Sequence, residues 1–151
     1  MSPSHWGPPI WALFHTMAEK VKEESFQLIG PQLFNLIKQI CQNLPCPDCA
    51  NHATAFLNKV NVKTIQTKTN FKMMLCVFHN SVNKRKDKPV FNSVDLEKYA
   101  GYRLPEVFQI FAQTYNKKLG NLKLMSESIA RTRTLLYVSD WFKQNHSHFN
   151  E

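Results

Sequence analysis

The chain has 151 residues, of which 43% are hydrophobic and 20% are charged, and its formal net charge is +8. This length is sufficient for one domain with a hydrophobic core, and it is too short for two domains of ordinary size. No stretch approaches the ~18 apolar residues of a membrane-spanning helix. The opening residues lack a basic region followed by an apolar run, so no signal peptide is expected and the expected location is the cytosol.

The positive charge is spread along the sequence, with one local cluster in "NKRKDKP" (83–89). A solvated surface explains most of it. The more specific interpretation is that this cluster binds a phosphate group. No zinc-finger, RNA-recognition or basic-zipper pattern accompanies the cluster, so nucleic-acid binding is not expected.

Apolar residues recur at helical spacing through almost the whole chain, and strand alternation is absent. The first predicted helix begins with Pro8 or Pro9 in its first turn and runs to about Glu23. A second covers 31–43, a third runs from the "CPDC" turn to about Lys59, and a fourth covers about 70–86. Residues 61–69 are expected to form a loop. Four helices with short connections predict an all-α protein built on a four-helix bundle.

The last third of the chain is also predicted to be helical. Residues 93–100 form a short fifth helix, and two longer patterns, 105–118 and 126–144, are separated by a break at Gly120. We therefore expect a core over residues 1–102. Residues 103–151 form a helical C-terminal extension, packed on the core or at a dimer interface.

The most informative spacing is Cys46-Pro47-Asp48-Cys49, in a chain with four cysteines. At a helix N-terminus, the dipole and the free N–H groups stabilise a thiolate and lower its pKa from about 8.5. Two intervening residues also allow the sulfurs to close into a disulfide. This pattern predicts a redox pair.

Zinc binding is the alternative for the same residues. Cys46, Cys49 and His52 could supply three ligands, with Cys76 or His79 on the fourth helix as the fourth. The protein would then be a zinc-stabilised helical interaction module. A flavin-free thiol-exchange protein is a third interpretation, although the chain lacks the βαβ pattern of a thioredoxin-type motif.

The fourth predicted helix carries a polar stripe of Cys76, His79, Asn80 and Asn83 at i, i+3, i+4 and i+7. Buried polar groups need hydrogen-bond partners, and a large heteroaromatic ligand would provide them. On the first helix Trp6 lies close in sequence to an i, i+4 pair, Trp11 and His15. Aromatic core packing explains this second group equally well, but together the two groups could form a slot for a flat ring.

Three segments together resemble the Erv/ALR family of FAD-linked sulfhydryl oxidases: "HWGPPIWALFHTMA" (5–18), "LPCPDCANHA" (44–53) and "LCVFHNSVNKRKDKP" (75–89). In order and spacing they match the family's WG-x3-W-x3-H, CxxC and C-x2-HN-x-VN-x4-KP elements, over roughly residues 5–102. The forms "MSPSHWG" and "LPCPxCxxHA" look most like the small versions of large DNA viruses, which would place the protein in host cytoplasm or in the virion.

The resemblance implies a helical bundle holding FAD, often as a homodimer, and it implies site residues. Cys49 would be the redox sulfur nearer the flavin, and Cys46 the one that an incoming thiolate attacks. Residues implied to line or contact the cofactor are Trp6, Gly7, Trp11, His15, Cys76, His79, Asn80, Val82, Asn83, Lys86, Lys88 and Tyr99, with the two lysines near the pyrophosphate and Tyr99 near the adenine.

The implied activity is a thiol oxidase that passes electrons from substrate thiols through the CxxC pair and FAD to oxygen, giving hydrogen peroxide. The family's second cysteine pair is absent, so the substrate would reach Cys46 directly, and a small thioredoxin-like carrier is the expected partner. Ser93 stands where a structural cysteine of some members lies. Cys41 has no role in the resemblance and is expected to be a buried thiol.

Overall fold

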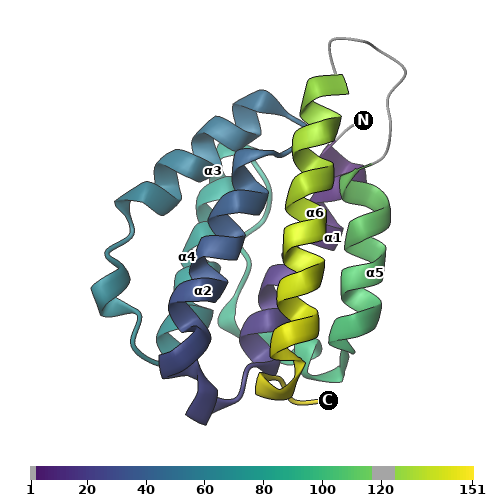
Figure 1. The fold of residues 1–151 in the computed structure, drawn as a ribbon. Helices are drawn as coiled ribbons and strands as arrows, with labels where there is room; N and C mark the ends of the chain where they lie inside the picture. Colours follow the sequence, from purple (N-terminus) through teal and green to yellow (C-terminus); the bar gives the residue numbers. More distant parts are fainter. Residues whose placement is uncertain (1–2, 117–124) are drawn as a thin grey trace.

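A computed structural model describes residues 3–116 and 125–151 of the chain (Figure 1). The α-helices are α1 (Pro3–Lys20), α2 (Glu23–Gln42), α3 (Pro47–Lys59), α4 (Lys68–Arg85), α5 (Leu104–Tyr115) and α6 (Met125–Asn145), and the 3₁₀ helices are η1 (Val62–Thr64), η2 (Ser93–Gly101) and η4 (His146–His148). Across these two ranges no strand occurs beyond an isolated bridge between Val21 and Phe149. The predicted all-α fold is confirmed. No helix in the described ranges combines the length and the hydropathy that crossing a membrane requires.

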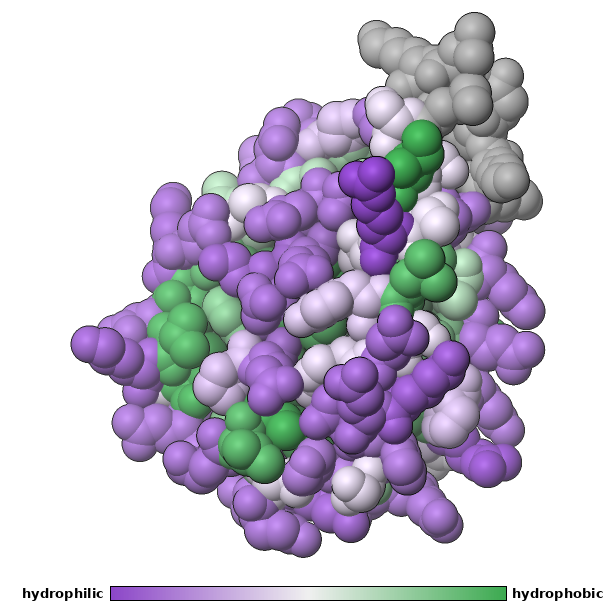
Figure 2. Space-filling view, viewed as in Figure 1, coloured by the Kyte–Doolittle hydropathy of each residue, from purple (hydrophilic) through white to green (hydrophobic). Residues whose placement is uncertain are grey.

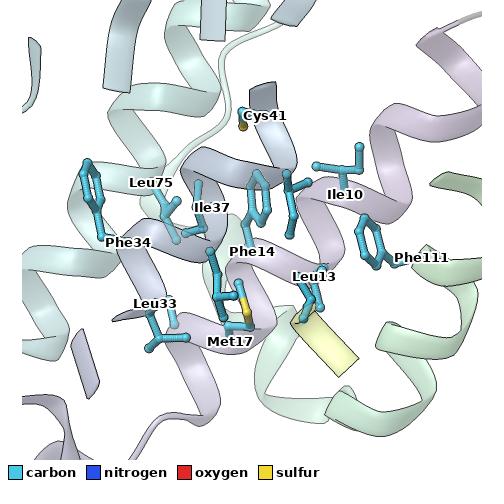
Figure 3. Packing of buried hydrophobic residues seen from close by; sticks show 14 of the residues in the cluster. Ile10, Leu13, Phe14, Met17, Leu33, Phe34, Ile37, Cys41, Leu75 and Phe111 are labelled. Carbon is cyan, nitrogen blue, oxygen red and sulfur yellow. The ribbon is translucent and has the colours of Figure 1, made fainter. Parts of the chain in front are cut away.

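The main core is one apolar cluster to which all six α-helices contribute buried side chains. Helix α1 packs against α4, α5 and η2, while α2 packs against α3, α4 and α6. Figure 3 shows how side chains of α1 and α2 interdigitate with neighbours from α4 and α5; it labels Ile10, Leu13, Phe14, Met17, Leu33, Phe34, Ile37, Cys41, Leu75 and Phe111. Apolar burial of this extent is what fixes the helices against one another.

Two predicted helix starts are wrong, and both errors involve proline. Helix α1 begins at Pro3, so Pro8 and Pro9 lie inside the helix rather than in its first turn. Helix α2 begins at Glu23 and contains Pro31 in its interior. Trp6 is buried in the added turn of α1, as are Phe26 and Ile29 in the added turns of α2. We infer that this burial outweighs the hydrogen bonds that the prolines remove.

The end of α1 also differs from the expectation of about Glu23. The helix ends at Lys20 because the C-terminal segment pairs with the residues that follow it. The Lys22 N–H donates to the carbonyl oxygen of His148 at 2.8 Å, and the Asn150 N–H donates to that of Lys20 at 2.6 Å. These contacts join residues at opposite ends of the sequence, so no local sequence pattern predicts them.

The third and fourth helices agree closely with the sequence. Helix α3 starts at Pro47, inside the CPDC turn, and ends at Lys59 as predicted. Helix α4 starts at Lys68, where Thr67 and Asn70 form a capping box. The predicted loop 61–69 contains η1 and the first two residues of α4, and only residues 61 and 65–67 are irregular.

Helices α5 and α6 run side by side and cover one flank of the molecule (Figure 1). The buried Tyr115 hydroxyl donates to the carbonyl oxygen of Ile40 in α2 at 2.8 Å, and Trp141 Nε1 donates to Gln32 at 2.7 Å. The predicted break at Gly120 lies outside the described residues. The face in Figure 2 is mostly hydrophilic, with apolar side chains in separate small groups.

Candidate functional site

The cysteine pair lies at the N-terminus of α3, at the turn that links α2 to α3. Cys46 is the N-cap of the helix, and its Sγ accepts the N–H of Cys49 at 3.2 Å. Cys46 is half-buried, whereas Cys49 is buried, and both are free thiols. Cys46 is therefore the more solvent-accessible cysteine of the pair.

The two thiols have pKa values shifted in opposite directions by their surroundings. Burial acts to raise the pKa of Cys46, but hydrogen bonds from the Cys49 side chain and N–H, with the charge of Lys86, outweigh it and lower that pKa. The pKa of Cys49 is raised, first by burial and then by its hydrogen bond with Cys46, against the opposing charge of Lys86. In the reduced pair, Cys46 is thus the preferred thiolate.

An arginine from α4 reaches across to this turn. Arg85 Nη2 lies 3.3 Å from Asp48 Oδ2, and Asp48 is one of the two residues between the cysteines. The same guanidinium favours the thiolate of Cys49, because its hydrogen bond acts to lower the pKa of that sulfur. Such an exposed ion pair contributes little stability, but it places a cation beside the redox pair.

A cavity of about 600 Å³ opens beside Cys49. Its walls come mainly from the start of α1, from α3, from the C-terminal half of α4 and from η2, with Cys41 of α2 and Ile110 of α5 added. This volume is in the range of ligand pockets. The aromatic residues in its lining are Trp6, Trp11, Phe14, His52, Phe56, Phe78, His79, Phe91, Tyr99 and Tyr102. The cations are Arg85, Lys86, Lys88 and Lys98, and no carboxylate is among the lining residues of the described chain. An anionic ligand with flat rings matches this chemistry.

Ring stacking links α1, α4 and the segment before η2. Trp11 stacks on His79 with ring centroids 4.0 Å apart and an interplanar angle of 6°. His79 in turn stacks on Phe91, and His15 stacks on Tyr99. His15 Nε2 and His79 Nδ1 lie 2.9 Å apart, so one ring donates to the other. These contacts pre-form an aromatic wall at the cavity.

Both imidazoles are held neutral. Burial, reinforced by the charges of His79 and Lys98, lowers the pKa of His15 to about 3. Burial also lowers the pKa of His79 to about 4, with help from Lys98 and Lys88. At neutral pH the pair therefore offers N–H donors and ring faces but no positive charge.

The two asparagines of the α4 stripe have partners within the chain. Asn80 exchanges two hydrogen bonds with the backbone of Phe91, at 2.7 and 2.8 Å. Asn83 Nδ2 donates to the carbonyl oxygen of Pro89 at 3.1 Å. A ligand was predicted to satisfy these amides, and that prediction is wrong because the chain itself provides their partners. The asparagines hold the segment after α4, residues 89–91, against that helix.

Most of the predicted site residues gather at the cavity: Trp6, Gly7, Trp11, Cys49, His79, Val82, Asn83, Lys86, Lys88 and Tyr99 all line it. Four do not line it, and these are Cys46, His15, Cys76 and Asn80. Cys46 lies in the adjoining turn, His15 and Asn80 support lining residues, and Cys76 packs with Phe91, Leu96 and Tyr99. Roles of individual residues toward a cofactor stay predictions.

Several lining residues were missed from the sequence. Lys98 lies over the ring of Tyr99, 5.1 Å from its centroid, and Arg85 is part of the basic cluster. Neighbouring cations in "NKRKDKP" and "EKY" were the available signal for these two. Tyr102 and Ile110 also line the cavity, and no local pattern marks them.

Two features of the described chain bear on which ligand the site can hold. Trp6 Nε1 is a buried donor without a hydrogen-bond partner on a residue that lines the cavity, so a ligand acceptor there would satisfy it. The zinc alternative gains no such support, since within residues 3–116 and 125–151 no three His, Cys, Asp or Glu side chains gather in a metal-binding cluster.

Sequence comparison agrees with this geometry. The model of the Erv1 / Alr family matches residues 8–101, which include the cysteine pair and almost the whole cavity lining. The chain belongs to the Erv1/Alr family. The match ends just before Tyr102, so α5 and α6 lie outside it.

Named relatives of this family member come from viruses and plants. A putative FAD-linked sulfhydryl oxidase of Invertebrate iridescent virus 6 is 29% identical over 96 residues, which cover 60% of this chain and 86% of the relative. The FAD-linked sulfhydryl oxidase of an African swine fever virus isolate (Tick/Malawi/Lil 20-1/1983) is 34% identical over 88 residues, 58% of this chain and 73% of the relative. That of Oryza sativa subsp. japonica is 32% identical over 85 residues, 56% of this chain and 43% of the relative.

Proposed function

We propose that this Erv1/Alr protein is an FAD-linked sulfhydryl oxidase that forms disulfide bonds in thiol substrates. The observation that carries the proposal is the position of Cys49. It lies in the wall of an aromatic, cationic cavity, while its partner Cys46 lies outside that wall. Relatives bearing the name FAD-linked sulfhydryl oxidase support the same activity.

The residues of the cavity suit FAD. Trp6, Trp11 and Tyr99 offer ring faces and edges, and Lys86 and Lys88 offer charge to a pyrophosphate. When bound, FAD supplies the two-electron oxidant for the reduced cysteine pair and passes the electrons to molecular oxygen, which yields hydrogen peroxide.

The cysteines carry out thiol–disulfide exchange. A substrate thiolate attacks Sγ of Cys46 in the Cys46–Cys49 disulfide, which breaks the S–S bond and releases Cys49 as a thiolate. The cation of Lys86 beside both sulfurs favours this release. A second substrate thiol then attacks the substrate sulfur of the mixed disulfide and releases Cys46. The lowered pKa of Cys46 makes it the better leaving group in this step.

The substrate is proposed to be a protein thiol that reaches Cys46 directly. Cys46 is half-buried beside the exposed Pro47 and Asp48, so a partner's cysteine can approach the turn from solvent. The two other cysteines, Cys41 and Cys76, are buried. A small carrier protein with its own exposed dithiol fits these conditions.

The test is an absorption spectrum with matched cysteine variants. We expect the purified protein to show a flavin band that dithiothreitol bleaches under nitrogen and that air restores, with oxygen consumed during turnover. Cys49→Ser and Cys46→Ser should each bind flavin as the parent does, yet lose dithiothreitol-dependent oxygen consumption by at least about 100-fold, because loss of one thiol prevents the exchange. A colourless protein containing stoichiometric zinc, or a Cys49→Ser variant with the parent rate, would overturn the proposal.

A further inference from the structure

Two residues of the cavity lining lie on the C-terminal side of the segment that matches the family. Tyr102 follows η2 directly, and Ile110 lies in the middle of α5. The family match ends at residue 101. The lining of this cavity therefore extends into the C-terminal part of the chain.

The rotation of α5 about its axis is fixed by its buried face. Leu104, Val107, Phe111 and Tyr115 recur at helical spacing and are buried, and α5 packs against α1 through this face. Ile110 precedes Phe111, so its side chain points ~100° away from that of Phe111 around the helix. This placement directs it along the flank of α1 to the cavity, without a role in the core.

Both residues expose apolar side-chain surface to solvent. Ile110 is 53% exposed and Tyr102 is 38% exposed. The neighbours of Ile110 on the outer side of α5, Gln109 and Gln113, are polar and exposed. The Tyr102 ring is fixed edge-on to Tyr99, with centroids 5.3 Å apart and an interplanar angle of 84°. A ligand that fills the cavity would cover this apolar surface.

We propose that helix α5 of the C-terminal extension completes the flavin site: Ile110 of α5, together with Tyr102 at the end of the core segment, forms an outer wall that contacts the apolar part of FAD. This inference rests on the proposed function. It assigns α5 a role in cofactor retention and exclusion of water, because α5 holds Ile110 against the bound cofactor. The cationic residues of the cavity bind the phosphates independently of this wall.

The proposal is tested by FAD affinity and flavin accessibility rather than by turnover. FAD is removed from the purified full-length protein and titrated back, and the same holoproteins are titrated with iodide, which quenches exposed flavin fluorescence. Ile110→Ser and Tyr102→Ser are compared with the parent. Leu136→Ser is the matched control, since Leu136 on α6 is 61% exposed and lies outside the cavity lining.

We expect Ile110→Ser to raise the Kd for FAD about fivefold to tenfold, the effect of uncovering part of one aliphatic side chain. Iodide quenching should increase in the same variant, and Ile110→Leu should restore both values to those of the parent. Tyr102→Ser should act in the same direction. Leu136→Ser should match the parent in both measurements.

Two results would contradict the proposal that Ile110 and Tyr102 form a wall of the flavin site. One is an unchanged Kd and unchanged quenching in both serine variants. The other is an increase in the Kd for FAD and in iodide quenching that is no larger than the increase in Leu136→Ser. If the parent itself binds no FAD, the proposed function fails instead, so the two failures are distinguishable. Because Ile110 and Tyr102 lie outside the core, the serine variants are expected to fold.

Discussion

The paired imidazoles of His15 and His79 make the stability of the flavin-free protein depend on pH. In the unfolded chain each ring gains a proton near the ordinary pKa of 6.5, whereas burial keeps the pKa of His15 at about 3 in the folded protein. Between these values the unfolded chain binds more protons, so stability is fully present above pH 6.5 and is lost as the pH falls toward 3. His79 acts in the same direction, down to its folded pKa of about 4.

We therefore predict that the free energy of unfolding falls between pH 7 and pH 5, by about 2 kcal/mol from His15 alone. Urea unfolding of the flavin-free protein at the two pH values measures this difference. In His15→Gln the fall should be smaller by about that amount, although the variant is less stable at pH 7. His146→Gln, an exposed control on η4, should keep the parent's pH dependence. An equal fall in His15→Gln and the parent would contradict the prediction.

Individual site residues were predictable where a local chemical rule acts. The spacing of Cys46 and Cys49, with Pro47 after the N-cap, was sufficient to predict a thiol pair at a helix start. The partners of Asn80 and Asn83 were not predictable in this way. They bond to the backbone at 89–91, and the sequence pattern of a polar stripe does not distinguish a chain segment from a ligand.

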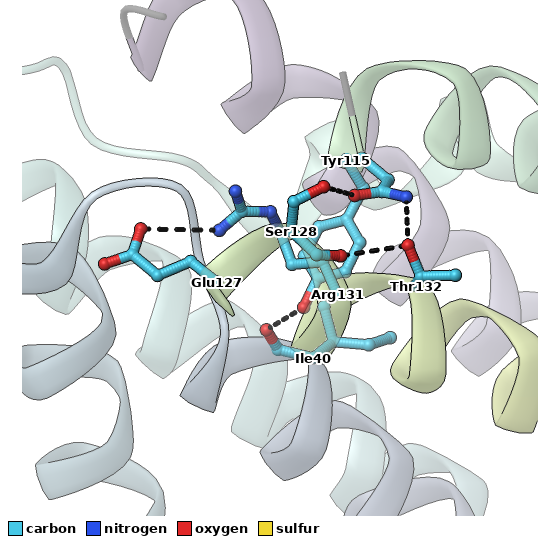
Figure 4. Close-up of polar contacts among 7 residues, drawn as sticks. Ile40, Tyr115, Glu127, Ser128, Arg131 and Thr132 are labelled. Atoms are coloured by element: carbon cyan, nitrogen blue, oxygen red, sulfur yellow. Dashed lines mark hydrogen bonds and ion pairs between the residues drawn. The ribbon is translucent and has the colours of Figure 1, made fainter. Parts of the chain in front are cut away.

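At the scale of elements, side chains of α5 and α6 hold the end of α2 just before the cysteine turn. Tyr115 of α5 donates to Ile40 at 2.8 Å, and Asn43, the C-cap of α2, donates to Thr134 of α6 at 3.2 Å (Figure 4 for the first contact). The buried Arg131 of α6 also lies in this region, 4.0 Å from Glu127. Unpaired carbonyl groups at a helix C-terminus favour such donors and cations.

We predict that Tyr115→Phe lowers the free energy of unfolding by about 1 kcal/mol, since it removes one buried hydrogen bond and leaves the ring in place. The Ile40 carbonyl still accepts the Asn43 N–H at 3.2 Å, so the loss should stay at this size. Urea unfolding of the variant provides the measurement. Tyr137→Phe is the matched control, because Tyr137 is 46% exposed on α6. Equal stability of the two variants would show that the Tyr115 hydroxyl does not anchor α2.

The elements themselves were predictable in type but not always in extent. Thr67 is a local N-cap signal for the start of α4. The regular spacing of apolar residues in α5 likewise indicates a helix. The starts of α1 and α2 depend on the burial of Trp6 and Phe26 by residues distant in sequence. Proline is a local signal against a helix, and tertiary packing outweighs it at both places.

At the scale of the whole molecule, α5 and α6 share one core with the segment that matches the family. Phe111 of α5 and Val138 of α6 are fully buried in the same cluster as Leu13 and Ile37. Separate domains would each have a core of their own. The homodimer expected from the resemblance stays a prediction, and α5 already covers one flank of α1 within the chain.

We predict that the protein unfolds as one cooperative unit, which native-state hydrogen exchange of the full chain can measure. The slowest amides of α2 and α6 should share one opening free energy, equal to the global free energy of unfolding. Phe111→Ala should lower protection in both helices by the same amount, about 3–5 kcal/mol, because it opens a cavity in the shared core. If α5 and α6 instead exchange through a lower-energy opening that leaves α2 protected, residues 103–151 form a separable unit. The stability of the wall at Ile110 would then be independent of the bundle.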